Sequence, residues 1–515
     1  MSRIAGHLPD DVHLHLDSNL SYVHPDRWFM EKYRRRGKDG KRKWDGIIRL
    51  YHRAQGQSFY TGLLSLVCNT LDADNISYQK IDTRKTPPIN LPHLTFTPPK
   101  YFEDRDYQSI TVDRSVSRTR GVLKVATGGG KTAIVSQIIG KIQRSPCLFY
   151  VLTKDLMRQA HETLSETLNE PIGQIGGGKC DIQKINICTV QTAIRALHQG
   201  DSSFRISDYL YDDEEDEEEA IKACEKNQAI RDLIGSARVV YVDECHHAAC
   251  RIITEVLSAS PHAYWRYGGS ATPYREDNAE LVIQAMFGKK IVDISASYLI
   301  ENGYLIEPYI LFEKITHDVP YHSYPKIYAE CVAKNEEFNA HVAATAKHLI
   351  DRGLSTLILV KQFNQGNLLK SMIPYTEFVT SKMTTKRRNQ AIDDLRQKKK
   401  LCMIATSLAD EGLDVPTLDA AILAGGGASS TRTFQRVGRT LRPDRNSPSP
   451  RSKSIVVYYE HSNKMLQKQA SKARKILKEE PAFHIVRSNG PDYICGEIDG
   501  IMETGPPPIS IWDAV

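Results

Sequence analysis

A glycine-rich segment at 125–132, VATGGGKT, has the residue types needed to hold a polyphosphate. It joins a β-type run to a helical run, so backbone N–H groups and a helix N-terminus can face an anion. Lys131 can reach the β- and γ-phosphates, and the Thr132 hydroxyl can ligate Mg²⁺. A strict phosphate-binding loop has glycine where this chain has Val125, so a chance glycine-rich turn stays the alternative.

Two other glycine runs serve as comparisons. IGGGKC at 175–180 has no Ser or Thr after its lysine, and AGGGAS at 424–429 has no lysine at all. We predict that both are turns.

A second group of residues, VVYVDECHH at 239–247, reads as a strand that ends in two carboxylates. Asp243 can hold Mg²⁺ through water, and Glu244 can orient and deprotonate a water that attacks a phosphate. Acidic pairs at strand ends are common. This pair follows the lysine-bearing loop by one domain's worth of strands and helices, and that position indicates phosphate hydrolysis.

The surrounding chain alternates short β-rich runs with helical runs, which predicts parallel sheets covered by helices. In the first half the expected strands are GVLKVAT, CLFYVLT, INICTV and ARVVYVD, and the expected helices are TAIVSQIIGKI and LMRQAHETLSETL. The pattern restarts near residue 340 with STLILVK, LCMIATS and LDAAILAG. Two successive α/β domains are therefore expected. Residues 1–95 form a first unit that ends in an extended Pro-rich linker, KTPPINLPHLTFTPPK.

Charge is unevenly distributed over the 515 residues. The net charge is +6, but 212–219 reads DDEEDEEE, so the rest of the chain carries +14, as a phosphate-backbone binder requires. The acidic run lies in a polar insertion at about 201–230. We interpret it as a solvated loop, and a DNA-mimicking regulatory loop is the alternative.

Composition excludes several other classes. There is no run of about 18 apolar residues, and the start, MSRIAGHLPDD, has no secretory core, so we expect neither a membrane span nor export. The ten cysteines include no C-x-x-C pair, which favours a reducing cytoplasm. ECHHAAC at 244–250 lacks the second ligand pair of a structural zinc site.

These motifs, in this order, resemble those of superfamily 2 helicases of the DExH type over most of the chain. The matching segments are RDYQ (105–108, the Gln motif), VATGGGKT, DECH, SATPYRED (270–277), ATSLADEGLDVP (405–416, motif V) and QRVGRTLR (435–442, motif VI). The resemblance implies two tandem RecA-like domains, at 96–308 and 309–480, followed by a tail at 481–515. It also implies that ATP binds between the two domains.

Roles for individual residues follow from the motifs and the resemblance. The expected catalytic residues are Lys131, Asp243, Glu244, Gln435, Arg439 and Arg442, the last two as arginine fingers. The expected ATP-binding residues are Arg105, Gln108, Thr127, Gly128, Gly129, Gly130, Lys131, Thr132, Gly412 and Asp414, with Mg²⁺ on Thr132 and Asp243. Fingers on a separate domain would make hydrolysis depend on domain closure. The alternative for QRVGRTLR is a basic helix on a solvated face.

Nucleic-acid contacts are implied in the same way. VLTKDLMRQ (151–159) resembles motif Ia and TVQT (189–192) motif Ib. We expect backbone contacts from Thr153, Lys154, Thr189, Thr192 and Thr406. Hydroxyls and amides on phosphates bind without reading sequence, as a translocating motor requires. A helix cap or strand hydroxyl is the alternative for each threonine.

The first unit, 1–95, is the expected DNA-binding domain, of small α+β type. Between residues 27 and 53 basic residues, Arg34, Arg35 and Arg36 among them, are interleaved with aromatic ones such as Trp44. The alternative is a solvated basic face with Trp44 in a small core. KWDGIIRLY followed by YTGLL resembles phage UvsW-type helicases, and the RED at 275–277 resembles a motif of XPB-type repair helicases.

The resemblance implies an ATP-dependent helicase or translocase acting on branched, single- and double-stranded DNA. Unwinding, annealing, fork regression and Holliday junction migration are its expected activities in recombination and repair, with single-strand-binding or recombination proteins as partners. Two enzyme alternatives stay open: the translocase subunit of a restriction or defence complex, and an RNA helicase. A non-catalytic nucleic-acid-binding protein is disfavoured because Lys131, Glu244, Arg439 and Arg442 are all present.

Overall fold

The computed structural model describes residues 1–24, 27–29, 44–99, 105–199, 224–249, 251–272, 280–316, 323–380, 383–406, 418–425, 438, 440–441, 453–488 and 491–502. Its contacts divide the chain into two compact units. Unit 1 is Met1–Val125 with Gly130–Asp293, and unit 2 is Ala126–Gly129 with Ile294–Val515. Residues 1–95 fall in unit 1, and the division of the chain into an N-terminal domain, two RecA-like domains and a tail stays a prediction.

Unit 1 is built on an eight-stranded sheet whose central strands are parallel. In spatial order its strands are β13 (Lys290–Ile294), β6 (Arg120–Val125), β12 (Trp265–Ser270), β11 (Val239–Val242), β7 (Cys147–Val151), β10 (Ile185–Thr189), β8 (Ile172–Gly176) and β9 (Lys179–Asp181). The strands read as continuous apolar runs because both faces of the sheet are covered.

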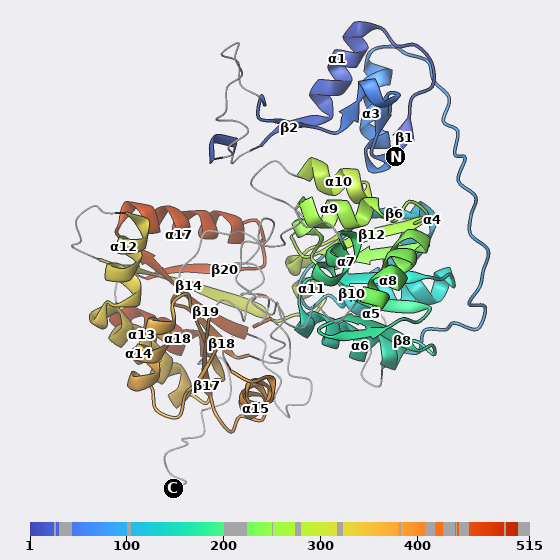
Figure 1. Cartoon of the computed structure of the whole chain (residues 1–515). Coiled ribbons are helices and arrows are strands. Elements are labelled where there is room, and N and C mark those ends of the chain that lie inside the picture. Colours follow the sequence, from blue (N-terminus) through green and yellow to red (C-terminus); the bar gives the residue numbers. More distant parts are fainter. Residues whose placement is uncertain are drawn as a thin grey trace. The chain divides into compact units, whose positions relative to one another are not determined.

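Two groups of helices cover the sheet of unit 1 (Figure 1). One group is α4 (Asp106–Arg118), α5 (Lys131–Ile142) and α6 (Lys154–Thr167). The other is α7 (Val190–Leu197), α8 (Cys224–Ser236) and α9 (Arg251–Ser258), with α10 (Glu280–Phe287) beside it. Side chains from alternate positions face the two groups: Tyr267 donates to the Ser115 carbonyl of α4 at 2.7 Å, whereas Leu148 and Val240 share a core with α7 to α9.

The N-terminal elements of unit 1 are small. They are β1 (Ser2–Arg3), α1 (Asp10–Asn19), β2 (Ser21–Val23), η1 (Arg27–Phe29), β3 (Ile47–Arg49), β4 (Tyr51–His52), η2 (Arg53–Gln55), β5 (Ser58–Phe59), η3 (Thr61–Leu63) and α3 (Leu64–Ala73). Their apolar side chains belong to the same core as α10: Val12, Leu16 and Leu63 are buried in one cluster with Ile283 and Met286. This region therefore shares its hydrophobic core with the first sheet.

The Pro-rich segment after α3 adopts no helix between residues 76 and 99, as predicted for a linker, and Figure 1 shows it as an extended run. It is nevertheless fastened to unit 1. Arg144 donates to the Pro87 carbonyl at 3.1 Å, and the Asn90 amide donates to the Ser145 carbonyl at 3.1 Å. Leu91 is buried at its centre. These contacts hold residues 76–99, here called the strap, against unit 1.

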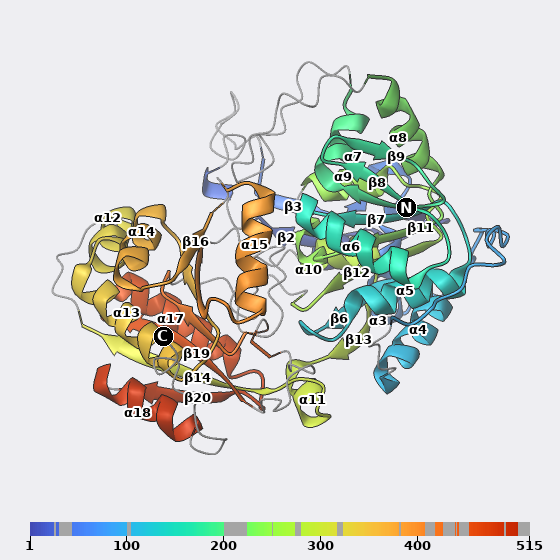
Figure 2. The ribbon, with the colours of Figure 1, turned by 90° about the horizontal axis from the view of Figure 1, so that it is seen from below.

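Unit 2 contains a second sheet of seven parallel strands. In spatial order they are β16 (Glu377–Val379), β17 (Cys402–Thr406), β15 (Thr356–Val360), β18 (Ala420–Leu423), β19 (Lys453–His461), β14 (Glu307–Ile315) and β20 (His484–Ser488). Helices flank it (Figure 2): α12 (Tyr324–Tyr328), α13 (Glu336–Asp351), α14 (Phe363–Met372), α15 (Thr385–Arg396), α17 (Lys464–Leu477) and α18 (Pro491–Met502), with α11 (Ala296–Glu301) before β14.

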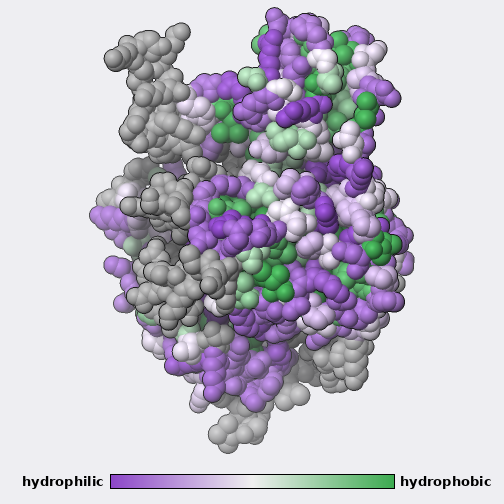
Figure 3. Space-filling view, turned by 45° about the vertical axis from the view of Figure 1, so that its right-hand side comes forward, coloured by the Kyte–Doolittle hydropathy of each residue, from purple (hydrophilic) through white to green (hydrophobic). Residues whose placement is uncertain are grey.

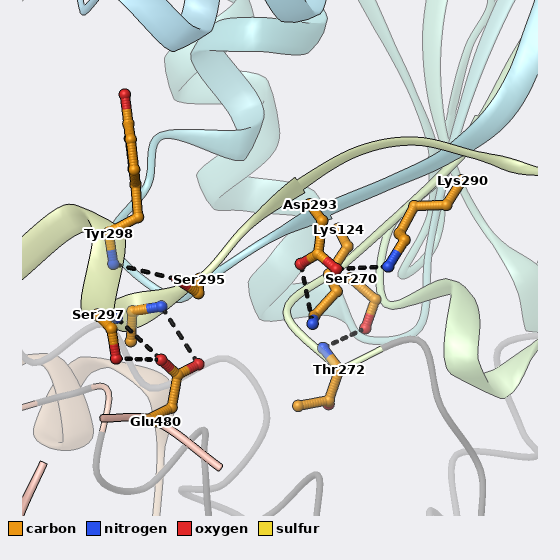
Figure 4. A network of polar contacts seen from close by, with 10 residues as sticks. Lys124, Ser270, Thr272, Lys290, Asp293, Ser295, Ser297, Tyr298 and Glu480 are labelled. Carbon is orange, nitrogen blue, oxygen red and sulfur yellow. Dashed lines mark hydrogen bonds and ion pairs between the residues drawn. The ribbon is translucent and has the colours of Figure 1, made fainter. Parts of the chain in front are cut away.

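The α11 N-terminus is capped from a distant part of unit 2. The Glu480 carboxylate accepts from the Ser297 backbone N–H at 2.9 Å and from the Ser297 hydroxyl at 2.7 Å (Figure 4). A carboxylate at a helix N-terminus pairs with unsatisfied N–H groups and with the positive end of the helix dipole. This contact ties the segment before β14 to the end of α17.

The predicted α/β fold with two parallel sheets is confirmed. The expected strands appear as β6, β7, β10, β11, β15, β17 and β18, and the expected helices as α5 and α6. Within the described part of the chain, no helix is both long and apolar enough to cross a membrane. The face drawn in Figure 3 is largely hydrophilic, with apolar side chains in small separate groups.

Replacement of Gly62 tests the shared core. A Cβ at this position would lie 2.0 Å from the Gln284 carbonyl oxygen, so η3 must move away from α10. We expect Gly62→Ala to lower the free energy of unfolding by about 1–3 kcal/mol, measured by urea denaturation. Gly235→Ala is the control, because a Cβ there meets nothing within 4 Å and alanine favours helix. Equal stability of the two variants would contradict the shared core.

Candidate active site

The glycine-rich loop lies between β6 and α5, as its sequence predicts. Gly128 and Gly130 have φ of +83° and +76°, a left-handed conformation that a residue with a Cβ adopts only under strain. Gly130 caps α5, which begins at Lys131. The Lys131 ammonium donates to the Val125 carbonyl at 3.4 Å. The loop thus places a lysine and the first N–H groups of α5 at one end of β6.

The predicted Gln motif packs against this loop. Gln108 is buried in the first turns of α4, and a Cβ at Gly130 would lie 2.6 Å from its Nε2 atom. Arg105 caps the same helix and donates to the Tyr107 hydroxyl at 3.0 Å. The sequence predicted these two residues beside the nucleotide, and the structure brings Gln108 to the glycine turn.

Strand β11 ends in the predicted carboxylates. Tyr241 donates to Asp243 Oδ1 at 3.4 Å, and the Glu244 backbone N–H donates to the same oxygen at 3.0 Å. Glu244 has φ of +48°, which is uncommon for a residue with a Cβ and typical of functional sites. Tyr241 is a residue that the motif analysis missed. Its hydroxyl needs the glycine at Gly269, where a Cβ would lie 1.9 Å away.

Sheet order explains why these groups meet. β12 lies between β6 and β11, and all three strands are parallel, so their carboxyl ends share one edge. That edge carries Lys131, the Asp243–Glu244 pair and Ser270, in agreement with the rule that ligands bind at the carboxyl ends of strands in open α/β sheets.

Charges at this edge influence one another. Burial and the neighbouring Glu244 carboxylate raise the pKa of Asp243 to about 6, although the Lys131 ammonium opposes them. Burial also acts to raise the pKa of Glu244. The Lys131 ammonium and a hydrogen bond with His246 outweigh burial and lower that pKa to about 2. Glu244 is therefore ionised at neutral pH, and Asp243 is a carboxyl that a nearby cation would stabilise in its charged form.

Glu244 is connected to the end of β12 by polar contacts. The Ser270 hydroxyl donates to Glu244 Oε2 at 3.4 Å and lies 3.1 Å from His246 Nδ1. The Thr272 backbone N–H donates to the Ser270 hydroxyl at 3.1 Å (Figure 4). Ser270 is fully buried, so this contact depends little on solvent. A change at Glu244 can therefore reach the SAT segment through one hydroxyl group.

The β6 end of this edge is held by an ion pair. Lys124, next to Val125, pairs with Asp293 of β13 at 2.9 Å, and Lys290 also contacts Asp293 (Figure 4). Burial opposes ionisation of Asp293, but the hydrogen bonds from Lys290 and Lys124 lower its pKa. The strand that carries the glycine loop is thus fixed to its outer neighbour.

The predicted nucleic-acid contacts of motifs Ia and Ib lie at the ends of β7 and β10. The Thr153 hydroxyl accepts from the Leu156 backbone N–H at 3.2 Å and caps α6. The Thr189 hydroxyl donates to the Thr192 hydroxyl at 2.8 Å. These three threonines thus have local structural partners, and their DNA contacts stay predictions. Lys154 is the first residue of α6.

The glycine run at 175–180 is a turn, as predicted. It joins β8 to β9, and the two residues between the paired strands, Gly177 and Gly178, have φ of +57° and +79°. The turn packs on the motif residues: a Cβ at Gly176 would lie 2.6 Å from the Thr189 hydroxyl, and one at Gly177 would lie 3.3 Å from the Lys154 side chain. Of the run at 424–429, only Ala424 and Gly425 are described.

In the N-terminal region, Trp44 is half-buried. Its indole N–H donates to the Ile47 carbonyl at 3.0 Å, and its ring meets His24 edge-on. Trp28, which the sequence analysis did not single out, is 53% exposed, and the Arg27 guanidinium lies over its ring at 5.0 Å. An exposed tryptophan beside a basic residue is the better candidate for stacking on a base. Its position next to Arg27 in a basic stretch was a signal that could have identified it.

Several predicted residues lie outside the described part of the chain. They are Arg34, Arg35, Arg36, Gly412, Asp414, Gln435, Arg439 and Arg442, together with the acidic run 212–219 and the RED at 275–277.

Thr406 is described at the end of β17, where its buried hydroxyl has no hydrogen-bond partner among the described residues. The same part of the chain holds no group of three or more His, Cys, Asp or Glu side chains arranged to bind a metal.

Comparison with known families agrees with this geometry. A sequence model described as "Type III restriction enzyme, res subunit" matches residues 101–275, and one described as "Helicase conserved C-terminal domain" matches residues 340–444. The first model covers the glycine loop and the carboxylate pair, and the second covers four of the seven strands of the unit 2 sheet. The chain is a superfamily 2 helicase.

Individual relatives of this helicase are distant. "Putative helicase 22" of Sulfolobus islandicus filamentous virus is 26% identical over 410 residues, which are 74% of this chain and 68% of the relative. The "DNA 3'-5' translocase XPB2" of Sulfurisphaera tokodaii is 24% identical over 388 residues, 66% of this chain and 79% of the relative.

Solved structures support the fold alone. The Saccharomyces cerevisiae Dbp5 structure bound to RNA and ADP BeF3 covers 79% of this chain and 94% of its own with a TM-score of 0.53 and 16% identity, in agreement with two RecA-like domains. The structure of T4 UvsW covers 94% of this chain and 96% of its own, but a TM-score of 0.42 is too low to support an argument. Superfamily 2 helicases are nucleic-acid-dependent ATPases, normally with Mg²⁺.

Two substitutions test the assignment of the site. We expect Lys131→Ala and Glu244→Gln each to lower the ATP hydrolysis rate at least about 10²-fold, because they remove phosphate positioning and water orientation. Glu244→Gln should still bind ATP, measured by a fluorescent nucleotide. Lys141→Ala and Glu162→Gln, exposed residues of α5 and α6, are the matched controls. Near-normal turnover in either site variant would show that the chemistry lies elsewhere.

Proposed function

We propose that this helicase hydrolyses ATP to move along DNA and that it acts preferentially at branched sites. The observation that carries the motor part is the convergence of Lys131, Glu244 and Ser270 at the carboxyl ends of three adjacent strands. The branched-DNA part rests on the basic and aromatic N-terminal region, which shares a core with the motor.

Each step of hydrolysis is assigned to named groups. The loop N–H groups at Gly128–Gly130 and the Lys131 ammonium hold the β- and γ-phosphates. The ionised Glu244 carboxylate orients the attacking water and accepts its proton, which can pass to His246 or to solvent. Arg439 and Arg442, from motif VI, neutralise the charge that develops on the phosphoryl oxygens. Gln435, Gly412 and Asp414 are assigned to the nucleotide by their motifs.

The donor groups of the site fit a magnesium ion. Two carboxylates follow each other at the end of β11. Burial and the Glu244 carboxylate raise the pKa of Asp243, so a cation beside it would stabilise its ionised form. Asp243, through water, and the Thr132 hydroxyl would hold Mg²⁺, since oxygen ligands suit this cation. When bound, Mg²⁺ supplies charge neutralisation at the β- and γ-phosphates.

Translocation follows from the link between hydrolysis and DNA grip. Glu244 contacts Ser270, and the SAT segment follows at the strand end. The helix N-termini at Thr153 and Thr189 present N–H groups and hydroxyls suited to phosphates of any sequence. The names of relatives such as the XPB2 translocase favour DNA as the strand that is tracked.

A preference for branched sites requires a second nucleic-acid surface. The motor grips one strand through phosphates and cannot by itself distinguish a junction from a linear strand. Trp28, Arg27 and the neighbouring Arg34, Arg35 and Arg36 offer stacking and charge for another arm. Because the strap and the shared core hold this region on unit 1, both surfaces belong to one body, and simultaneous binding raises the local concentration of each arm.

Point variants test this proposal better than truncation, because removal of residues 1–95 would expose Ile283 and Met286 of α10. We expect Trp28→Ala to weaken binding to four-way junctions and forks by about 5–100-fold, the range that loss of one base stack gives. Linear single strands should lose much less. Neutralising Arg34, Arg35 and Arg36 together should flatten the salt dependence of junction binding.

The matched controls are Trp44→Phe, at a half-buried ring, and Tyr375→Ala, at a ring of unit 2 that is 82% exposed. Affinities are measured on junction and linear substrates at two salt concentrations. If Trp28→Ala lowers the affinity for branched and for linear DNA equally, this region binds nucleic acid without a preference for branched sites.

A second candidate is the translocase subunit of a restriction complex, favoured by the description of the family that matches residues 101–275. Such a subunit should require a nuclease or methylase partner. Junction unwinding by the purified chain alone favours the first function, and activity that appears only with a nuclease partner favours the second.

A further inference from the structure

Two arginines are neighbours at the amino-terminal edge of the unit 1 sheet. Arg120 begins β6, and Arg266 is its partner in the register of β12, so both side chains leave the same face of the sheet. β6 is six residues long, so the glycine loop at its other end lies at least about 17–20 Å away along the strand. These arginines therefore belong to no part of the ATP site.

Both guanidinium groups are partly withdrawn from water without matching acids. The Nε atoms of Arg120 and Arg266 are buried and have no hydrogen-bond partner among the described residues. Arg266 donates once, to the Ser260 carbonyl at 2.8 Å. The Arg120 side chain makes no hydrogen bond or ion pair with any residue that the structure describes. Buried cations are normally paired, so this arrangement is unusual.

The surroundings add more positive than negative charge. Arg84, on the strap, is close enough to Arg120 to act on it electrostatically. The amino group of Met1 is close enough to interact with both Arg120 and Arg266. Among the described residues, Asp82 is the acid that acts on Arg120, and it is already paired with Arg84 at 2.7 Å. Burial and the Arg266 guanidinium together lower the pKa of Arg120 to about 9. An anion at this place would remove the repulsion.

The strap keeps this place formed. The Arg84 guanidinium lies 4.8 Å from the centre of the Tyr264 ring, and the Thr86 hydroxyl donates to the Tyr264 hydroxyl at 3.2 Å. Tyr264 directly precedes β12, the strand of Arg266. Arg84 is thus fixed at the rim by contacts that do not depend on a ligand.

We propose that Arg120 and Arg266, with Arg84 at the rim, form a binding site for a phosphate-type oxyanion at the edge of the sheet opposite the ATP site. Guanidinium groups bind tetrahedral oxyanions through paired N–H donors, and two of them in register can contact separate oxygens. The phosphate can be a free anion or a phosphodiester of duplex DNA, because both present the same oxygens.

The test uses the full chain with Lys131→Ala, so that the glycine loop does not contribute. Inorganic phosphate is titrated at constant ionic strength, with chloride as the balancing anion, while the unfolding midpoint is measured. A ligand of the folded state raises this midpoint in a saturable way. We expect Arg120→Gln to weaken the phosphate response about tenfold or more, as loss of charge-assisted hydrogen bonds implies. Arg118→Gln, an exposed neighbour with the same charge change, should respond normally.

A fold defect is distinguishable from loss of the site. Without phosphate, Arg120→Gln should unfold at the same temperature as the parent or higher, because one of two repelling charges is gone. Arg120→Lys, which keeps the charge and loses the paired donors, should show an intermediate phosphate response if the glutamine variant does not fold.

A second arm identifies the source of the phosphate. If the site holds DNA, Arg120→Gln weakens duplex binding and lowers its salt slope by about one, and inorganic phosphate competes. If it holds a free anion, duplex affinity is unchanged and the phosphate response alone is lost. The proposal is overturned if Arg120→Gln matches Arg118→Gln both in the phosphate dependence of its unfolding midpoint and in its affinity for duplex DNA.

Discussion

The ammonium of Lys131 and the adjacent carboxylates of Asp243 and Glu244 form the electrostatic contact on which the site depends. Two acids at the end of one buried strand repel each other, and Lys131, the first residue of α5 after the glycine loop, offsets that repulsion. The contact exists because β6, β12 and β11 are parallel neighbours whose carboxyl ends share an edge. The glycine turn, the left-handed backbone at Glu244 and the Lys124–Asp293 ion pair all hold these strand ends in place.

Much of this arrangement could be predicted from sequence. The apolar runs that become β6 and β11 are short, rich in β-branched residues and followed by the motif residues. Both the strands and the position of the loops after them could therefore be predicted. The turn at Gly177–Gly178 could be distinguished from a phosphate loop because no hydroxyl follows its lysine. Local patterns carried these predictions because helix, strand and loop are decided largely by neighbouring residues.

Contacts between residues far apart in the sequence could not be predicted from local patterns. Nothing local shows that Gly62 must be small to fit against α10, or that the Pro-rich segment is fastened to Ser145. Trp28 and Trp44 both lie in basic surroundings, and burial decides which ring is exposed. Likewise, Arg120 and Arg266 are neighbours because β6 pairs with β12, a sheet order that periodicity does not give. These features link the N-terminal region, the strap and the sheet into one body.

In the proposed function, hydrolysis is linked to DNA through Ser270, whose hydroxyl contacts Glu244 and accepts from Thr272. The most direct measurement is the number of base pairs opened per ATP by Ser270→Ala. We predict that DNA-independent ATP hydrolysis stays within about threefold of the parent. The number of base pairs opened per ATP should fall about tenfold, since a buried hydrogen bond to a charged group is lost. An unchanged number of base pairs per ATP would contradict it.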